Sequence, residues 1–356
     1  MVTPSTWFAA ILLLVLSFFC LGAWINVFKQ TGRWRFELFS FDFAIGALLL
    51  AVLAAYTFGT LGSQLGFSDQ MLVAGRTNQA LAVLGGGAFA LGNMLLLSAV
   101  SLIGISASFP IAFGLALTVS TAYYFKPAHF LAQSIAMIFV VVAAVLAGLA
   151  ARTRGAALQM AAPQVQPSPP KPAGRSRSRS RHRPPKVRPL YVKGIFVAVL
   201  GGIGIGASLP IIDRGETGDL GLGPYAGALL FTLGMLGSTV VLNIYFMNIA
   251  IHGGRITPRA YWKGQPKQHL LGFLGGGVWA AGALALGLAL SLQGQNSPSP
   301  AVELLLPLAS VPLAVIFGVF GWKEFGGAPS ATLKSLLASV AFFLGGAALL
   351  AFSVRR

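Results

Sequence analysis

Long apolar stretches recur along this chain, separated by short polar segments, and they set its architecture. A helix needs roughly 20 predominantly apolar residues to cross the hydrocarbon core of a bilayer. Ten windows meet this requirement, and they cover residues 6–28, 41–60, 79–101, 103–124, 128–150, 192–212, 225–247, 269–292, 299–321 and 333–354. The sequence therefore predicts an all-α polytopic membrane protein with ten transmembrane helices.

The composition agrees with that class and excludes several others. Charged residues make up 9% of the chain, against roughly 25% in soluble domains. The single cysteine, Cys20, allows neither a disulfide framework nor a cysteine-based metal site. The four histidines have no metal-ligand spacing. We expect no metal, no cofactor and no catalytic residue, since neither paired acids nor a Ser–His pair occurs at one depth.

The polar interruption at residues 151–193 divides the chain into two halves. It holds eleven of the 25 Lys and Arg, including the run RSRSRSRHRPPKVRP at 175–189. A tract of like charges with little apolar surface favours disorder. We predict a first five-helix repeat at 1–150, a disordered basic linker at 151–193 and a second five-helix repeat at 194–356.

The basic residues also predict the orientation. Cytoplasmic loops carry the excess of Lys and Arg, and most of the net charge of +17 lies in or beside this linker. We therefore expect a cell-membrane protein with the linker in the cytoplasm and both termini outside. The charge needs no nucleic-acid partner; the expected partners are the lipid bilayer and a small-molecule solute, and a homo-oligomer remains open.

A glycine motif recurs at a constant offset of 190 residues. LGGGAFALG at 84–92 matches LGGGVWAAG at 274–282, so Phe89 aligns with Trp279. Because each half has an odd number of helices, a duplicated half enters the membrane inverted, as in many secondary transporters. We predict two inverted five-helix repeats, with the glycines of both motifs serving close helix packing or a cavity: Gly85, Gly86, Gly87, Gly275, Gly276 and Gly277.

Polar and aromatic side chains within the spans are the candidates for solute contact. Intramembrane polar groups tend to face the bundle interior, which favours Asn93 and, more weakly, Ser108, whose hydroxyl could instead bond its own helix. Trp24, Trp279 and Phe89 could line a cavity or simply pack in the core. We place the site between the third, fourth, eighth and ninth helices.

Carboxylates near helix ends are the candidates for proton coupling. Asp42 and Glu37 lie near the cytoplasmic start of the second helix, where a cap on the helix dipole is the alternative reading. Glu324 follows Lys323, and we expect those two residues to pair.

Several motifs in order resemble the ureide-permease and sugar-porter branch of the drug/metabolite transporter superfamily. They are GRWRFELF at 32–39 with Asp42, the GGG…LGN segment ending at Asn93, the HLLG…GGGVW segment from His269 to Trp279, and GWKEF at 321–325. The resemblance covers nearly the whole chain. It implies ten helices in inverted repeats, a long cytoplasmic loop after the fifth helix and a bacterial inner membrane. A Walker-like motif that plant members carry in this loop is missing here.

These observations favour a permease that moves a small polar solute, such as a ureide, nucleobase or sugar, by alternating access with or without protons. Two alternatives stay open. One is a multidrug or metabolite exporter of the same fold, and the other is a non-transporting scaffold that acts through the basic linker.

Overall fold

The computed structural model describes residues 1–32, 34–62, 65–161, 190–218, 220–251, 253–292 and 297–353. These residues are helical wherever they are regular, and ten of the helices are long and apolar enough to cross a membrane. The all-α polytopic prediction is therefore confirmed. The elements are α1 (Trp7–Gln30), α2 (Phe36–Tyr56), α3 (Phe67–Val73), α4 (Arg76–Ile103), α5 (Ile105–Tyr123), η1 (Pro127–His129), α6 (Phe130–Ala161), α7 (Leu190–Glu216), α8 (Pro224–Asn248), η2 (Pro258–Lys263), α9 (Pro266–Leu290), α10 (Pro300–Leu308), α11 (Ser310–Ile316), η3 (Phe317–Gly321) and α12 (Ser330–Ser353).

Helix boundaries differ from the predicted windows at several places, of which those near the predicted site and the linker matter most. α2 begins at Phe36, so Glu37 and Asp42 lie inside the helix. α6 runs to Ala161 and α7 begins at Leu190, which shortens the predicted linker at both ends. The extension of α6 follows good helix formers such as Ala, Leu, Gln and Met. The basic run at 175–189 lies outside the described residues. The ninth span is broken into α10, α11 and η3.

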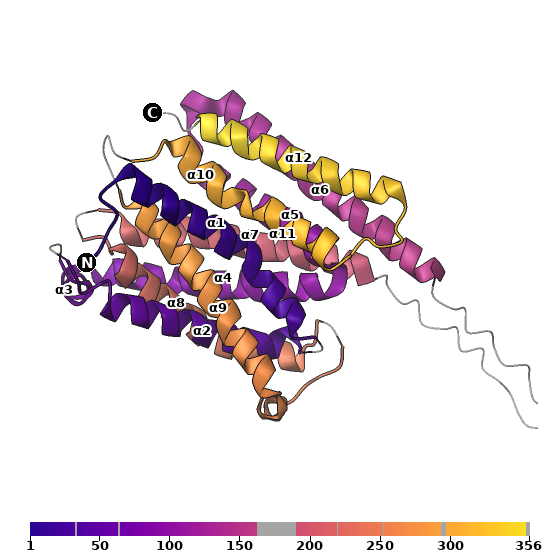
Figure 1. Ribbon diagram of the computed structural model, residues 1–356, viewed down its shortest axis with the longest axis horizontal. Coiled ribbons are helices and arrows are strands. Elements are labelled where there is room, and N and C mark those ends of the chain that lie inside the picture. Colours follow the sequence, from indigo (N-terminus) through magenta and orange to yellow (C-terminus); the bar gives the residue numbers. More distant parts are fainter. Residues whose placement is uncertain are drawn as a thin grey trace, which may run out of the picture.

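The helices pack in pairs that match between the two halves. In chain order the ten spans are α1, α2, α4, α5, α6, α7, α8, α9, the broken span from α10 to η3, and α12. The contact of the third span with the sixth (α4 with α7) corresponds, five spans on, to that of the eighth with the first (α9 with α1). The contact of the third span with the seventh (α4 with α8) corresponds in the same way to that of the eighth with the second (α9 with α2). Likewise α5 packs on α7, as α10 and α11 pack on α1. α6 and α12 lie side by side along one edge of the bundle (Figure 1).

Two helix crossings depend on glycine at the positions of closest approach. A Cβ added to Gly276 in α9 would overlap the backbone carbonyl of Phe43 in α2, and one added to Gly86 in α4 would overlap that of Phe231 in α8. The facing helices contribute a glycine in return: Gly46 lies against the carbonyl of Phe273, and Gly234 against that of Val83. Small residues allow such backbone contact in lipid, where packing drives association.

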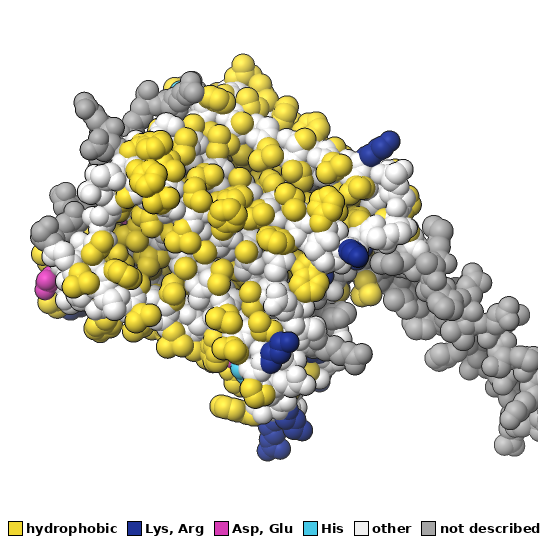
Figure 2. Space-filling model, in the orientation of Figure 1, with side chains coloured by type: hydrophobic (Ala, Val, Ile, Leu, Met, Phe, Trp, Pro, Cys, Tyr) yellow, Lys and Arg dark blue, Asp and Glu magenta, His cyan; other side chains and the backbone are white. Residues whose placement is uncertain are grey.

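The outer surface agrees with a lipid environment. The face in Figure 2 is covered by hydrophobic side chains, and most of its Lys and Arg lie toward the end of the bundle where α6 ends and α7 begins. We call this the linker end; it holds the C-terminus of α6 and the N-terminus of α7. The other end of the bundle is the opposite end.

Candidate functional site

A cavity of about 360 Å³ lies inside the bundle. Its lining residues come from α1, α2, α4, α5 and α7 to α11, and none of the described residues of α6 or α12 contributes. All four spans that the sequence placed around the site, α4, α5, α9 and the broken ninth span, take part.

One wall of the cavity is aromatic. Phe89 of α4 and Trp279 of α9 stack with ring centroids 4.5 Å apart and planes inclined by 27°. Phe231 of α8 lies next to them, with its ring nearly parallel to Trp279 at 6.1 Å. Trp24 of α1 also lines the cavity and is 1% exposed. The glycine crossings bring α4 against α8 and α9 against α2, and each glycine lies about one turn before Phe89 or Trp279 on its own helix.

Asn93 is the buried polar residue of this site. It lines the cavity one turn from Phe89 and is 3% exposed. Its Oδ1 has no hydrogen-bond partner among the described residues. The hydroxyls of Ser208 and Thr232, which also line the cavity, donate to carbonyls of their own helices. An amide with unused hydrogen-bonding capacity in an apolar cavity is suited to hold one edge of a solute.

The remaining predicted contact residue lies elsewhere. Ser108 is fully buried in α5, outside the lining of the cavity, and its Oγ has no described partner. At the other four glycines that the sequence assigned to packing or a cavity, an added Cβ would have more room than at Gly86 and Gly276. The nearest atoms to an added Cβ are 3.4 Å away at Gly85 and 4.0 Å at Gly277; at Gly87 and Gly275 they are side-chain atoms, at 2.7 and 3.0 Å.

The cavity approaches the surface at the opposite end. Glu216 at the end of α7 and Leu290 at the end of α9 belong to its lining, and both are exposed. Glu216 is the ionisable side chain among the described lining residues.

The linker end is closed by two polar clusters, neither of which lines the cavity. In the first, which we call the Asp42 cluster, Asp42 is fully buried and accepts a hydrogen bond from the Tyr261 hydroxyl. Both Asp42 oxygens lie 3.0 Å from His269 Nδ1. Burial and the bond to Asp42 raise the pKa of Tyr261 above its usual range, so Tyr261 stays a donor at neutral pH. This cluster ties α2 to η2 and α9.

Glu37, the other proton candidate, is held differently. It is fully buried and forms an ion pair with Arg35, which also donates to the carbonyl of Gly254. The Glu37 carboxylate is therefore already paired with a permanently charged guanidinium.

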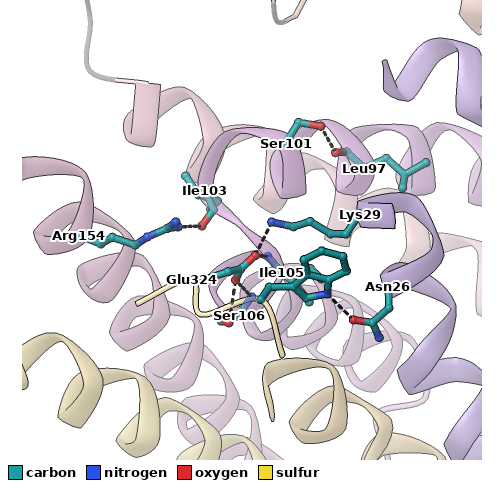
Figure 3. A network of polar contacts seen from close by, with 10 residues as sticks. Asn26, Lys29, Leu97, Ser101, Ile103, Ile105, Ser106, Arg154 and Glu324 are labelled. Atoms are coloured by element: carbon teal, nitrogen blue, oxygen red, sulfur yellow. Dashed lines mark hydrogen bonds and ion pairs between the residues drawn. The ribbon is translucent and has the colours of Figure 1, made fainter. Parts of the chain in front are cut away.

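The second cluster centres on Glu324, in the turn before α12, and we call it the Glu324 latch (Figure 3). Its carboxylate lies 2.7 Å from Lys29 Nζ of α1. It also accepts hydrogen bonds from the backbone N–H of Ile105 and from the backbone N–H and hydroxyl of Ser106, at 2.8 to 2.9 Å. The expected pair with Lys323 is wrong, because the fold brings Lys29 to this buried carboxylate instead.

Local backbone geometry makes room for the latch. Gly104 separates α4 from α5 at φ +88°, and a Cβ there would meet the Glu324 carboxyl group at 2.7 Å. Burial alone raises the pKa of Glu324, but Lys29 and the backbone donors outweigh burial and hold that pKa below its ordinary value. Arg154 of α6 donates to the carbonyl of Ile103 beside the latch.

Sequence reasoning did not identify Lys29 or Phe231 as parts of this site. Lys29 carries only the generic signal of a basic residue at a helix end. Phe231 lies three residues before Gly234, a small residue of the kind that marks close helix packing. That Phe231 lies beside the cavity follows only from the crossing of α4 and α8.

Comparisons with known proteins add little. No family model matches this sequence, and no curated protein matches it. A solved structure described only as "Crystal structure of protein" aligns with a TM-score of 0.49 and 16% sequence identity, over 96% of this chain and 96% of that one. This likeness is too distant to carry an inference about function.

Proposed function

We propose that the protein is a secondary transporter that carries a small solute through the central cavity by alternating access. The observation that carries the proposal is the asymmetry of the cavity. It extends from Trp24 and Asn93 toward exposed Glu216 at one end, while two polar clusters close the other. A solute site near the midplane that is closed on one side is what alternating access requires.

The clusters at the linker end have the properties of a gate. The Glu324 latch joins α1, the start of α5 and the segment before α12, which belong to different spans. Opening this end would separate Lys29 from Glu324. Domain and helix motions of this kind need discrete contacts that break and re-form.

Matching packing pairs support the inverted-repeat architecture as part of this proposal. The contacts of α4 with α7, of α4 with α8 and of α5 with α7 each have a counterpart five spans later. The resemblance to the ureide-permease and sugar-porter branch of the drug/metabolite transporter superfamily belongs to the same proposal. So does the orientation, with the linker in the cytoplasm of a bacterial inner membrane and both termini outside, since the basic residues favour it.

The alternatives predict different dependence on the linker. A multidrug or metabolite exporter would use the same cavity and differ only in its solute and direction. A scaffold acting through the basic linker would not need Asn93 or Trp279. We favour transport over a membrane enzyme because the described residues that line the cavity include one ionisable side chain, Glu216, and no acid–base pair.

Solute flux through the protein reconstituted in liposomes tests the proposal. Proteoliposomes with the full chain should take up at least one solute from a panel of nucleobases, ureides, monosaccharides and aromatic amines faster than empty liposomes. Deleting residues 175–188 should leave this uptake intact, whereas Asn93→Ala should reduce it. Absence of flux for every solute, with protein that is folded by circular dichroism, would overturn the proposal.

A further inference from the structure

We infer that the cavity binds a flat aromatic or heteroaromatic molecule that bears one or two polar atoms on its edge and no negative charge. This rests on the proposed function and narrows it. Of the solutes that the sequence suggested, nucleobases fit this description, while sugars and non-aromatic ureides do not.

The aromatic wall supplies the first argument. Phe89 and Trp279 stack, and Phe231 is inclined to Trp279 by only 26°, so ring faces of similar tilt gather at one depth. Trp24 also lines the cavity, from α1. Aromatic rings stabilise a packed pair beyond what their buried area gives, and flat solutes gain most from such walls.

The second argument is that few polar side chains line the cavity. The polar side chains of the described lining are Asn93, Ser208, Glu216, Thr232 and Ser310. Ser208 and Thr232 already donate to their own helices. A sugar would bury several hydroxyls against this lining, and each unpaired one costs free energy. The Asn93 amide offers one donor and one acceptor side by side, which suits the edge of a heteroaromatic ring.

The third argument is the charge of the residues that line the cavity. Among the described residues, no Lys, Arg or His lines the cavity, and Glu216 lies at its exposed end. An anionic solute would lose its hydration without gaining a counter-charge. A cation is tolerated better, since Trp24 and Trp279 line the cavity and aromatic rings attract cations.

The size of the cavity agrees with a compact ring system as the solute. A volume of about 360 Å³ lies near the lower limit of the roughly 300–1,000 Å³ that small-molecule sites occupy. It accommodates one compact ring system rather than an oligomeric or lipid-sized molecule.

Thermal unfolding of the full chain in lipid nanodiscs, followed by circular dichroism, tests the inference directly. Indole, tryptamine and indole-3-acetate share one ring and differ in charge; adenine, glucose and allantoin complete the set. At about 1 mM, adenine, indole and tryptamine should raise the melting temperature by about 2 °C, because a ligand of the folded state stabilises it by mass action. Indole-3-acetate, glucose and allantoin should not.

Variants show whether the effect comes from the cavity. Asn93→Leu, which keeps the size and removes the amide, should abolish the adenine shift, and Trp279→Phe should weaken all aromatic shifts. Trp262→Ala changes a side chain that is 83% exposed, in η2 and outside the cavity lining, and should keep every shift. Retention of the shifts in Asn93→Leu and Trp279→Phe alike would place binding elsewhere and overturn the inference.

The remaining outcomes separate this inference from the proposed function. Stabilisation by glucose or allantoin without stabilisation by the aromatic probes would overturn the inference and leave transport standing. No stabilisation by any probe would also overturn it. Aromatic stabilisation without flux in proteoliposomes would support the site chemistry and contradict transport.

Discussion

Phe89 and Trp279 occupy equivalent positions in the two glycine motifs, 190 residues apart, and their rings stack on one another at 4.5 Å. Residues related by a two-fold axis can touch only where that axis passes between them. If the halves are inverted repeats, this stack marks the axis, and it lies in the wall of the cavity. A solute bound here would contact both halves at once.

Trp279 should therefore matter more for solute binding than for assembly. We expect Trp279→Phe to retain flux with an apparent affinity about fivefold weaker, because one aromatic contact is worth about 1 kcal/mol. Trp279→Ala should lose most flux. Uptake into proteoliposomes at several solute concentrations measures this, with Trp262→Ala as the matched control. Equal flux in wild type and Trp279→Ala would remove Trp279 from the solute site.

The glycine crossings give a prediction with a neighbouring control. A Cβ at Gly276 would overlap the carbonyl of Phe43, whereas the nearest atom at Gly277 is 4.0 Å away. Gly276→Ala should lower the free energy of unfolding by about 1–3 kcal/mol, the usual cost of overpacking. Gly277→Ala should be neutral or slightly stabilising, since alanine is the better helix former. Thermal melts in detergent compare the two, and equal effects would contradict the crossing.

The sequence predicted the spans well because membrane helices obey a simple rule. Backbone groups in lipid must bond within their own segment, so a long apolar run has one structural outcome. The small-residue motif likewise predicted close packing at Gly86 and Gly276. The predictions that failed depend on distant partners: Glu324 has Lys323 beside it in sequence but binds Lys29, at the far end of the chain.

The site was predictable only in part for the same reason. Asn93, Trp24, Phe89 and Trp279 are unusual enough within apolar spans to stand out, and all four line the cavity. Ser108 carried the same signal and lies outside it. Which face of a helix meets a cavity depends on crossing positions, and a single sequence of nearly all-apolar helices gives little periodicity to fix them.

The Glu324 latch should control access from the linker end. Breaking a buried ion pair costs about 3–5 kcal/mol, so Glu324→Gln should shift the population toward states open at that end. We would place one cysteine at Leu96, which lines the cavity, in a Cys20→Ser background. Labelling with an impermeant maleimide from the linker side should rise about tenfold or more in Glu324→Gln. Lys267→Ala, a change at an exposed lysine, should leave it unchanged, and no rise in Glu324→Gln would contradict the gate.

The latch should also have a defined pH range. The pKa of Glu324 is lowered in the folded protein by Lys29 and the backbone donors. A lowered pKa stabilises the fold fully above the unfolded-state value, about 4.3 for Glu, and this contribution disappears as the pH falls through the folded-state value. The melting-temperature advantage of wild type over Glu324→Gln should therefore be constant from about pH 8 to 5.5 and shrink below about pH 4. An advantage that instead fades between pH 8 and 6 would assign the pH dependence to another group.

Asp42 is the remaining candidate for proton coupling, and its surroundings distinguish it from Glu37. It faces His269 and Tyr261, neither of which carries a permanent charge, whereas Glu37 is paired with Arg35. Asp42→Asn keeps the shape and still accepts from Tyr261, so the protein should fold. If protons couple through Asp42, flux in wild type should vary with pH over about 5.5 to 8, and that variation should fall to within about twofold in Asp42→Asn, while Glu37→Gln retains the wild-type profile. An unchanged profile in Asp42→Asn would assign the coupling to another group or leave transport uncoupled from protons, and direct measurement of proton uptake with solute would separate those two results.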